Sequence, residues 1–259
     1  MRFSRGPWLR RRGWRGVERV RYETHVYPDS KTAAEACADY AVARLEEALA
    51  ARAYATLAVS GGSSPKPMFA RMAESAIDWS HIHVFWVDER AVPPTDAASN
   101  YKMAAESLVT RVKIPTGNVH RIRAELGAEA AARTYSQEIR EFFGLRAGEM
   151  PEFDVVHRGM GAESHTASLF PGEPLIEDRA GLAAAVEVPA TPHGRITLLP
   201  GPLVAARRTV MLVAGADKAE SLRAVFEEPL DPLRYPAQLG PPEGRGMVWF
   251  LDEAAASLL

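Results

Sequence analysis

Strand-like and helix-like segments alternate along most of the chain, and this alternation limits the folds that the sequence can adopt. Short apolar runs predict strands at residues 22–27, 57–59, 82–87, 153–156, 209–213 and 247–251. Segments rich in helix formers predict helices at 32–50, 101–109, 128–143 and 218–226, with a further helix beginning near residue 65. Strands joined through helices form mostly parallel sheets with helices on both faces. We therefore predict an α/β fold with a doubly wound, Rossmann-like sheet.

Three local signals refine this prediction. Thr32 and Glu35 have the spacing of a capping box, so we expect the first helix to begin there. Cys37 is the single cysteine, which excludes an intramolecular disulfide, and we interpret it as a small buried apolar side chain. The prolines from Pro229 to Pro242 predict a long surface loop, because proline interrupts regular hydrogen bonding.

The beginning of the chain differs in composition from the rest. Eight arginines precede Tyr22, against the single acid Glu18. We expect a poorly ordered basic extension over residues 1–19 and one α/β domain over residues 20–259. An organelle-targeting peptide and a polyanion-binding arm share this composition, so both remain alternatives for the extension.

The composition of the whole chain argues against several classes of partner. The formal net charge of −2 gives no general attraction to nucleic acid. No apolar run approaches the roughly 20 residues that a membrane-spanning helix needs. We therefore expect a cytoplasmic monomer that binds neither nucleic acid nor a membrane.

A turn rich in glycine and hydroxyl groups follows the predicted strand at 57–59. It comprises Ser60, Gly61, Gly62, Ser63 and Ser64. The N–H groups and hydroxyls of such a turn bind anions, and the following helix N-terminus adds positive potential. The turn lacks the lysine of an ATP-binding P-loop and the third glycine of a dinucleotide site. It suits a small phosphate monoester, although a turn that only connects a strand to a helix has a similar sequence.

Charged residues follow other predicted strands. Asp88, Glu89 and Arg90 come after the strand at 82–87, and Arg90 can bind phosphate with Asp88 or Glu89 orienting it. Arg195 and Lys218 are further candidates, because Lys218 opens a predicted helix where a cation is unfavourable without a nearby anion. Ligands of open α/β sheets bind beyond the carboxyl ends of the strands, so these positions predict an anion site.

The loop after the strand at 153–156 combines glycines, hydroxyls, a carboxylate and imidazoles. Glu163 and His165 lie within it. Such a mixture occurs where water is activated beside an anionic substrate, although a lone histidine is more often structural.

Five sequence blocks occur in an order and spacing that narrow the possibilities further. They are Ser60–Pro65; Asp88–Arg90 with Val92, Pro93 and Ser99–Tyr101; Gly159–Gly161 with His165–Gly172; Arg195–Leu198; and Trp249–Ala255. Together they resemble the 6-phosphogluconolactonase family, in the superfamily that includes glucosamine-6-phosphate deaminases. Arg90 resembles the lactonase branch, since deaminases usually carry tyrosine there.

The resemblance implies hydrolysis of 6-phospho-D-glucono-1,5-lactone to 6-phospho-D-gluconate, a step of the oxidative pentose phosphate pathway. It implies that His165 is the general base and that Glu163 orients it. The implied substrate-binding residues are Ser60, Gly61, Gly62, Ser63, Ser64, Asp88, Arg90, Asn100, Arg195 and Lys218. No metal or cofactor is expected, because a lactone is already an activated ester and no dense cluster of ligand residues is present.

The sequence departs from the family pattern at two places. The family usually has Gly-x-Asp-Gly-His, whereas Glu163 and Ser164 precede His165 here. Ser164 carries a steric cost if the family glycine has a positive φ. His157 and Arg158 replace apolar residues at the end of a buried strand, where an unpaired charge is costly.

Two other functions remain alternatives. A sugar-phosphate isomerase or deaminase would use Asp88 as the base for enolisation. A sugar-phosphate-binding regulator would keep the anion site but lack turnover. Loss of ammonia from glucosamine 6-phosphate would identify the former, and binding of 6-phosphogluconate without hydrolysis would identify the latter.

Overall fold

A computed structural model describes residues 22–188, 193–240 and 246–259. The basic extension predicted for residues 1–19 lies outside the described residues. So do the first two residues of the domain predicted for 20–259 and two of the prolines in the predicted loop, Pro241 and Pro242.

Seven parallel strands form the central sheet. They are β1 (Glu23–Tyr27), β2 (Ala55–Val59), β3 (Ile82–Trp86), β5 (Val119–His120), β6 (Val155–Arg158), β9 (Thr209–Val213) and β10 (Met247–Asp252). Their order across the sheet is β1-β10-β9-β6-β2-β3-β5. The chain proceeds from β2 to β3 and β5 and then returns to β6 on the other side of β2. The order in which strands are added to the sheet therefore reverses between β2 and β6, while all strands stay parallel. The predicted doubly wound α/β fold is confirmed.

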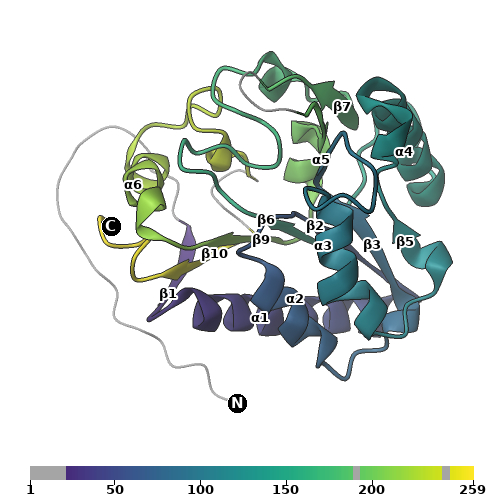
Figure 1. Cartoon of the computed structure of the whole chain (residues 1–259), viewed down its shortest axis with the longest axis horizontal. Helices are drawn as coiled ribbons and strands as arrows, with labels where there is room; N and C mark the ends of the chain where they lie inside the picture. Colours follow the sequence, from purple (N-terminus) through teal and green to yellow (C-terminus); the bar gives the residue numbers. More distant parts are fainter. Residues whose placement is uncertain (1–21, 189–192, 241–245) are drawn as a thin grey trace.

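Helices cover both faces of this sheet (Figure 1). The α-helices are α1 (Ser30–Ala51), α2 (Lys66–Ala73), α3 (Asn100–Ser107), α4 (Ala128–Phe143), α5 (Pro200–Ala205) and α6 (Ala219–Glu227). Short 3₁₀ helices are η1 (Trp79–His81), η2 (Val109–Arg111), η3 (Thr116–Asn118), η4 (Ala124–Leu126), η5 (Pro174–Glu177), η6 (Ala216–Lys218) and η7 (Pro236–Gln238). Adjacent residues of β10 show the two layers, since Phe250 packs on Tyr40 of α1 and Trp249 packs on Phe226 of α6.

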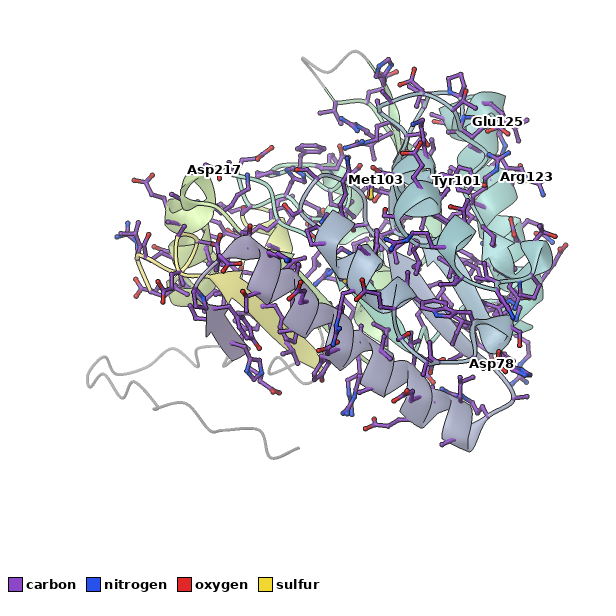
Figure 2. All side chains as sticks on the ribbon, turned by 60° about the horizontal axis from the view of Figure 1, so that its bottom comes forward. Asp78, Tyr101, Met103, Arg123, Glu125 and Asp217 are labelled. Carbon is purple, nitrogen blue, oxygen red and sulfur yellow. The ribbon has the colours of Figure 1, made fainter. Side chains whose placement is uncertain are left out.

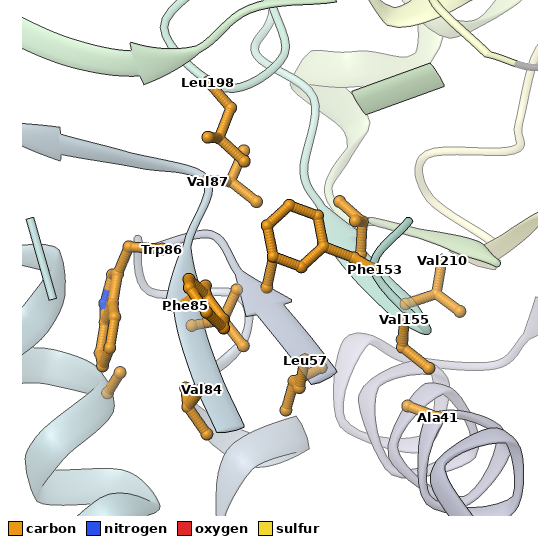
Figure 3. Close-up of a cluster of buried hydrophobic side chains, with 14 of the residues drawn as sticks. Ala41, Leu57, Val84, Phe85, Trp86, Val87, Phe153, Val155, Leu198 and Val210 are labelled. Atoms are coloured by element: carbon orange, nitrogen blue, oxygen red, sulfur yellow. The ribbon is translucent and has the colours of Figure 1, made fainter. Parts of the chain in front are cut away.

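Aromatic and branched side chains fill the space beside the middle of the sheet (Figure 3). Leu57, Phe85 and Phe153 are fully buried there, and the rings of Phe85 and Phe153 meet edge to face at 5.1 Å. Tyr135 of α4 hydrogen-bonds both the N–H and the carbonyl of Trp86. This packing fixes the ends of β2 and β3, from which the candidate site residues project.

The first helix begins earlier than predicted. Asp29 is the N-cap of α1, and its carboxylate accepts a hydrogen bond from the Thr32 N–H at 2.8 Å. The capping-box prediction was therefore wrong, because Asp29 accepts the Thr32 N–H that the Glu35 side chain was expected to accept. Cys37 is fully buried, as predicted.

A second sheet, which we did not predict, stands beyond the end of β3. Its strands are β4 (Asp88–Arg90), β8 (Arg195–Leu198) and β7 (Ala183–Val186), all antiparallel. The Leu198 N–H donates to the Val87 carbonyl at 2.7 Å, which attaches this sheet to the main one. None of the described helices is long and apolar enough to cross a bilayer.

Candidate active site

One face of the second sheet gathers four polar residues. Asp88 pairs with Thr197 and Arg90 pairs with Arg195 across β4 and β8. Because side chains alternate along a strand, these four share one face, whereas Glu89 points to the other. The register therefore places two arginines directly opposite each other at the carboxyl end of β3.

The paired arginines form a concentration of positive charge. Burial and the neighbouring Arg90 both lower the pKa of Arg195. The Nε atoms of Arg90 and Arg195 are buried without a hydrogen-bond acceptor among the described residues. Two guanidinium groups with unused donors suit a bound phosphate or carboxylate.

Glu89 has a different role from the predicted one. Its carboxylate accepts hydrogen bonds from the backbone N–H groups of Arg90, Asn100 and Tyr101, each at 2.7 Å. Burial raises the pKa of Glu89 despite these bonds. The Arg90 guanidinium donates to the Ala98 carbonyl at 2.6 Å, and no ion pair joins it to Asp88 or Glu89 in the described chain. Glu89 therefore holds the start of α3, and the prediction that a carboxylate orients Arg90 was wrong.

The glycine turn lies against Asn100 at the start of α3. A Cβ on Gly61 would stand 1.8 Å from the Asn100 Oδ1, so only glycine fits there. Asn100 Nδ2 donates to the Asp88 carbonyl at 2.9 Å. Gly62 has φ +101°, which also favours glycine. The structure thus brings the turn of residues 60–64, Asn100 and Asp88 together.

The loop that contains His165 contacts the same sheet face through Ser168. The Ser168 hydroxyl donates to Asp88 Oδ2 at 2.8 Å, and its N–H donates to Thr197 Oγ1 at 3.2 Å. Asp88 is therefore engaged by Ser168 on one side and by Asn100 on the other. Through Asn100, which lies against Gly61, Asp88 connects the glycine turn to the histidine loop.

His165 stands beside a carboxylate within this loop. Its Nδ1 lies 3.0 Å from Glu163 Oε1, and its ring packs at 4.5 Å on the ring of Phe170. A Cβ on Gly161 would be 2.0 Å from His165 Nδ1, so the imidazole occupies the space over that glycine. Nδ1 is buried and makes no hydrogen bond of normal geometry with the described residues, so Glu163 is an electrostatic neighbour of the imidazole. A carboxylate this close favours a proton on Nδ1, which leaves Nε2 to accept one.

Lys218 belongs to the surroundings of Glu163. Burial raises the pKa of Glu163, but its own backbone N–H, His165 and Lys218 outweigh that effect and hold the pKa below its ordinary value. Lys218 lies at the end of η6, and its Nζ is 2.6 Å from Asp217 Oδ2. In Figure 2, Asp217 lies on the left of the molecule, and Tyr101 of α3 lies on the right.

Ser164 adopts the left-handed conformation that the family glycine suggested, with φ 69°. Its carbonyl accepts a hydrogen bond from the Ala237 N–H at 2.9 Å, which helps to hold this conformation. The Ser164 hydroxyl is buried and has no partner among the described residues. The residue before His165 is therefore strained.

Replacing Ser164 with glycine should stabilise the protein. A side chain in the left-handed region costs about 1–2 kcal/mol, and the entropy of glycine offsets about 0.5–1 kcal/mol of the gain. Urea denaturation of Ser164→Gly should show a free energy of unfolding raised by about 1 kcal/mol. Ser221→Gly, in the right-handed helix α6, should instead lose about 0.5–1 kcal/mol. Equal losses for both variants would contradict the assignment of strain to Ser164.

His157 and Arg158 are both buried at the end of β6. Arg158 donates to the Leu239 carbonyl, but its Nε and Nη1 have no partner among the described residues. Burial lowers the pKa of Arg158 to about 10. The sequence predicted a free-energy cost for burying this charge. The hydrogen bond to the Leu239 carbonyl offsets only part of that cost.

The site is built from the carboxyl ends of four neighbouring strands, β3, β2, β6 and β9. Arg90 and Arg195 bring positive charge to this edge of the sheet, the glycine turn brings backbone N–H groups, and the histidine loop brings the imidazole of His165 beside the Glu163 carboxylate. Within the described residues, no group of three or more His, Cys, Asp or Glu side chains could hold a metal ion. An imidazole, paired arginines and a glycine turn at the carboxyl ends of the strands of an α/β sheet are typical of enzymes that act on phosphorylated metabolites.

Comparison with known proteins identifies the family within that class. A family model described as glucosamine-6-phosphate isomerases/6-phosphogluconolactonase matches residues 28–249. The chain is 38% identical over 218 residues to the 6-phosphogluconolactonase of Synechocystis sp., covering 83% of this chain and 89% of that one. The chain therefore belongs to the glucosamine-6-phosphate isomerase/6-phosphogluconolactonase family of enzymes.

Solved structures agree with this membership. The 6-phosphogluconolactonase from Thermotoga maritima superposes with a TM-score of 0.78 at 27% identity, covering 90% of this chain and 100% of that one. A monomeric glucosamine-6-phosphate deaminase superposes with a TM-score of 0.76 at 16% identity, over 92% of this chain and 100% of that one. The second likeness shows a shared fold alone.

Proposed function

We propose that the protein hydrolyses 6-phospho-D-glucono-1,5-lactone to 6-phospho-D-gluconate, with His165 as the general base. The observation that carries this proposal is the pairing of His165 Nδ1 with Glu163 Oε1 at 3.0 Å, in a loop joined to the arginine-bearing sheet face. The relatives named 6-phosphogluconolactonase support the same reaction.

The reaction needs an anchored phosphate and an activated water. Arg90, Arg195 and the N–H groups of residues 61–64 in the glycine turn bind the phosphate. His165 Nε2 takes a proton from water while the water oxygen bonds to the lactone carbonyl carbon. The carbonyl carbon then releases the ring oxygen, which takes the proton back from the His165 imidazolium and becomes a hydroxyl. The carboxylic acid that forms loses its proton to solvent and becomes a carboxylate. Ionised Glu163 stabilises the imidazolium that forms in between.

The arrangement of Asp88 favours hydrolysis over the deaminase alternative. A base for enolisation needs a carboxylate lone pair that is directed at the substrate, and hydrogen bonds from the protein occupy some of these lone pairs. Both Asp88 oxygens already accept hydrogen bonds, Oδ1 from Asn100 at 3.3 Å and Oδ2 from Ser168 at 2.8 Å. Asp88 thus serves as a structural link between loops.

Hydrolysis of freshly generated 6-phospho-D-glucono-1,5-lactone tests the proposal. The protein should accelerate ring opening well beyond the spontaneous rate, which is measured in parallel and subtracted. It should release no ammonia from glucosamine 6-phosphate. Binding of 6-phosphogluconate without acceleration would support the regulator instead, and release of ammonia would support the deaminase.

A further inference from the structure

The strands β2 and β6 are the parallel neighbours between which the strand order of the sheet reverses, and they separate at their carboxyl ends. Their ladder ends with the pair Ala58 and Val156. Beyond this pair, the Ser60 N–H donates to the Nδ1 atom of His157 at 3.4 Å. An imidazole thus continues the connection between the strands where backbone pairing stops.

This imidazole also contacts the helix that follows the glycine turn. Its ring meets the ring of Phe69 in α2 edge to face, with 5.9 Å between the centroids. His157 and Ser60 are both buried, with exposed fractions of 1% and 6%. His157 therefore contacts the chain on both sides of the glycine turn, at Ser60 where the turn begins and at Phe69 in the helix that follows it.

The imidazole must be neutral to accept a hydrogen bond at Nδ1, with its proton on Nε2. Burial lowers the pKa of His157 to about 3, so the ring stays neutral at the pH values where enzymes are assayed. Nε2 is buried without a partner among the described residues, which shows that the ring is not held by a second hydrogen bond. The contact with Ser60 is thus the polar interaction that orients it.

We propose that His157 is a positioning residue that fixes the phosphate-binding turn by accepting the Ser60 N–H. The bond directs this N–H toward β6 and leaves the N–H groups of residues 61–64 for the phosphate. An apolar residue at position 157, as the family pattern has, would leave the buried Ser60 N–H without this acceptor. The inference rests on the proposed function of the turn.

Steady-state kinetics of His157→Leu and His157→Asn test this inference. An asparagine amide oxygen can replace Nδ1 as acceptor, whereas leucine cannot. For His157→Leu we expect KM to rise by about five- to tenfold, with kcat changed less than about twofold. His157→Asn should recover most of the loss. Affinity for 6-phosphogluconate should follow KM, whereas affinity for unphosphorylated gluconate should not change.

A measurement on the unmodified protein guards against variants that fail to fold. The ¹⁵N chemical shifts of the His157 ring should show a proton on Nε2 and a bare Nδ1. A proton on Nδ1, or a KM for folded His157→Leu equal to that of the unmodified protein, would overturn the inference. So would an asparagine variant no better than the leucine variant. If the unmodified protein binds no 6-phosphogluconate, the proposed function itself fails and this inference fails with it.

Discussion

His165→Ala should reduce kcat for lactone hydrolysis by about 10²–10⁴-fold, the usual contribution of a general base. The reason is that Nε2 would no longer take the proton from the attacking water. Affinity for 6-phosphogluconate should change little, because the phosphate is bound by Arg90, Arg195 and the glycine turn. Progress curves with the spontaneous reaction subtracted give kcat, and calorimetry gives the affinity.

A matched histidine variant separates this effect from general damage. His25 is half-buried on the edge strand β1, where it pairs with Glu23 away from the site. His25→Ala should keep the activity of the unmodified protein. Full turnover by a folded His165→Ala protein would remove His165 from the mechanism. Loss of 6-phosphogluconate binding in that variant would show that the histidine holds substrate instead.

Arg195→Gln should weaken binding of 6-phosphogluconate by about 10- to 150-fold, because a hydrogen bond to a charged group contributes about 1.5–3 kcal/mol. The stability of the free protein should stay constant or rise, since the substitution removes the charge that faces Arg90 in the register. Weaker binding together with unchanged or higher stability distinguishes an arginine that binds the ligand from one that supports the fold. Calorimetry and thermal unfolding without ligand measure them.

Arg195 is a cleaner choice than Arg90 for this experiment. The Arg90 guanidinium also donates to the Ala98 carbonyl, so its removal would disturb the segment before α3. Arg146→Gln provides a control, because Arg146 is exposed and pairs with Glu149 outside the site. Unchanged affinity in Arg195→Gln would show that this arginine does not bind phosphate. A large loss of stability would show a structural role.

Six of the seven strands of the main sheet were predictable, because most of them are buried on both faces, whereas the two-residue β5 was not predicted. Runs such as Leu57–Val59 are short, apolar and bounded by glycine, so their length and composition mark them as strands. The predicted strands also gave the positions of their carboxyl ends. Most candidate site residues were found because they come soon after those ends in the sequence. A steric cost at Ser164, which replaces a glycine in a recognisable motif, was predicted on the condition that this position has a positive φ, and the structure shows that it has.

The second sheet was not predictable from local sequence. Its strand β7 consists of three alanines and a valine, and β4 consists of three charged residues. Neither has the composition of a strand. Both form strands because they pair with β8, which is attached to the main sheet. The role of Glu89 was missed for the same reason, since its N–H partners at positions 100 and 101 are distant in sequence.

The buried face of α1 was also difficult to predict. Cys37, Ala41 and Leu45 are fully buried, whereas Ala36 and Tyr40 are only partly buried. Alanine occurs on every side of this helix, so its hydrophobic pattern does not distinguish the face that meets the sheet. Packing against β10 decides the orientation.

The register of β4 and β8 limits how this site can change during evolution. A single-residue insertion in either strand would exchange its two faces and send the intervening residue, Glu89 or Ile196, toward the ligand. One such event would remove an arginine from the site while the parallel sheet could still fold. Length changes between β7 and β8 carry no such constraint, provided that the strand register is kept. Lineages of this fold should therefore vary in length at that connection and keep β4 and β8 free of insertions.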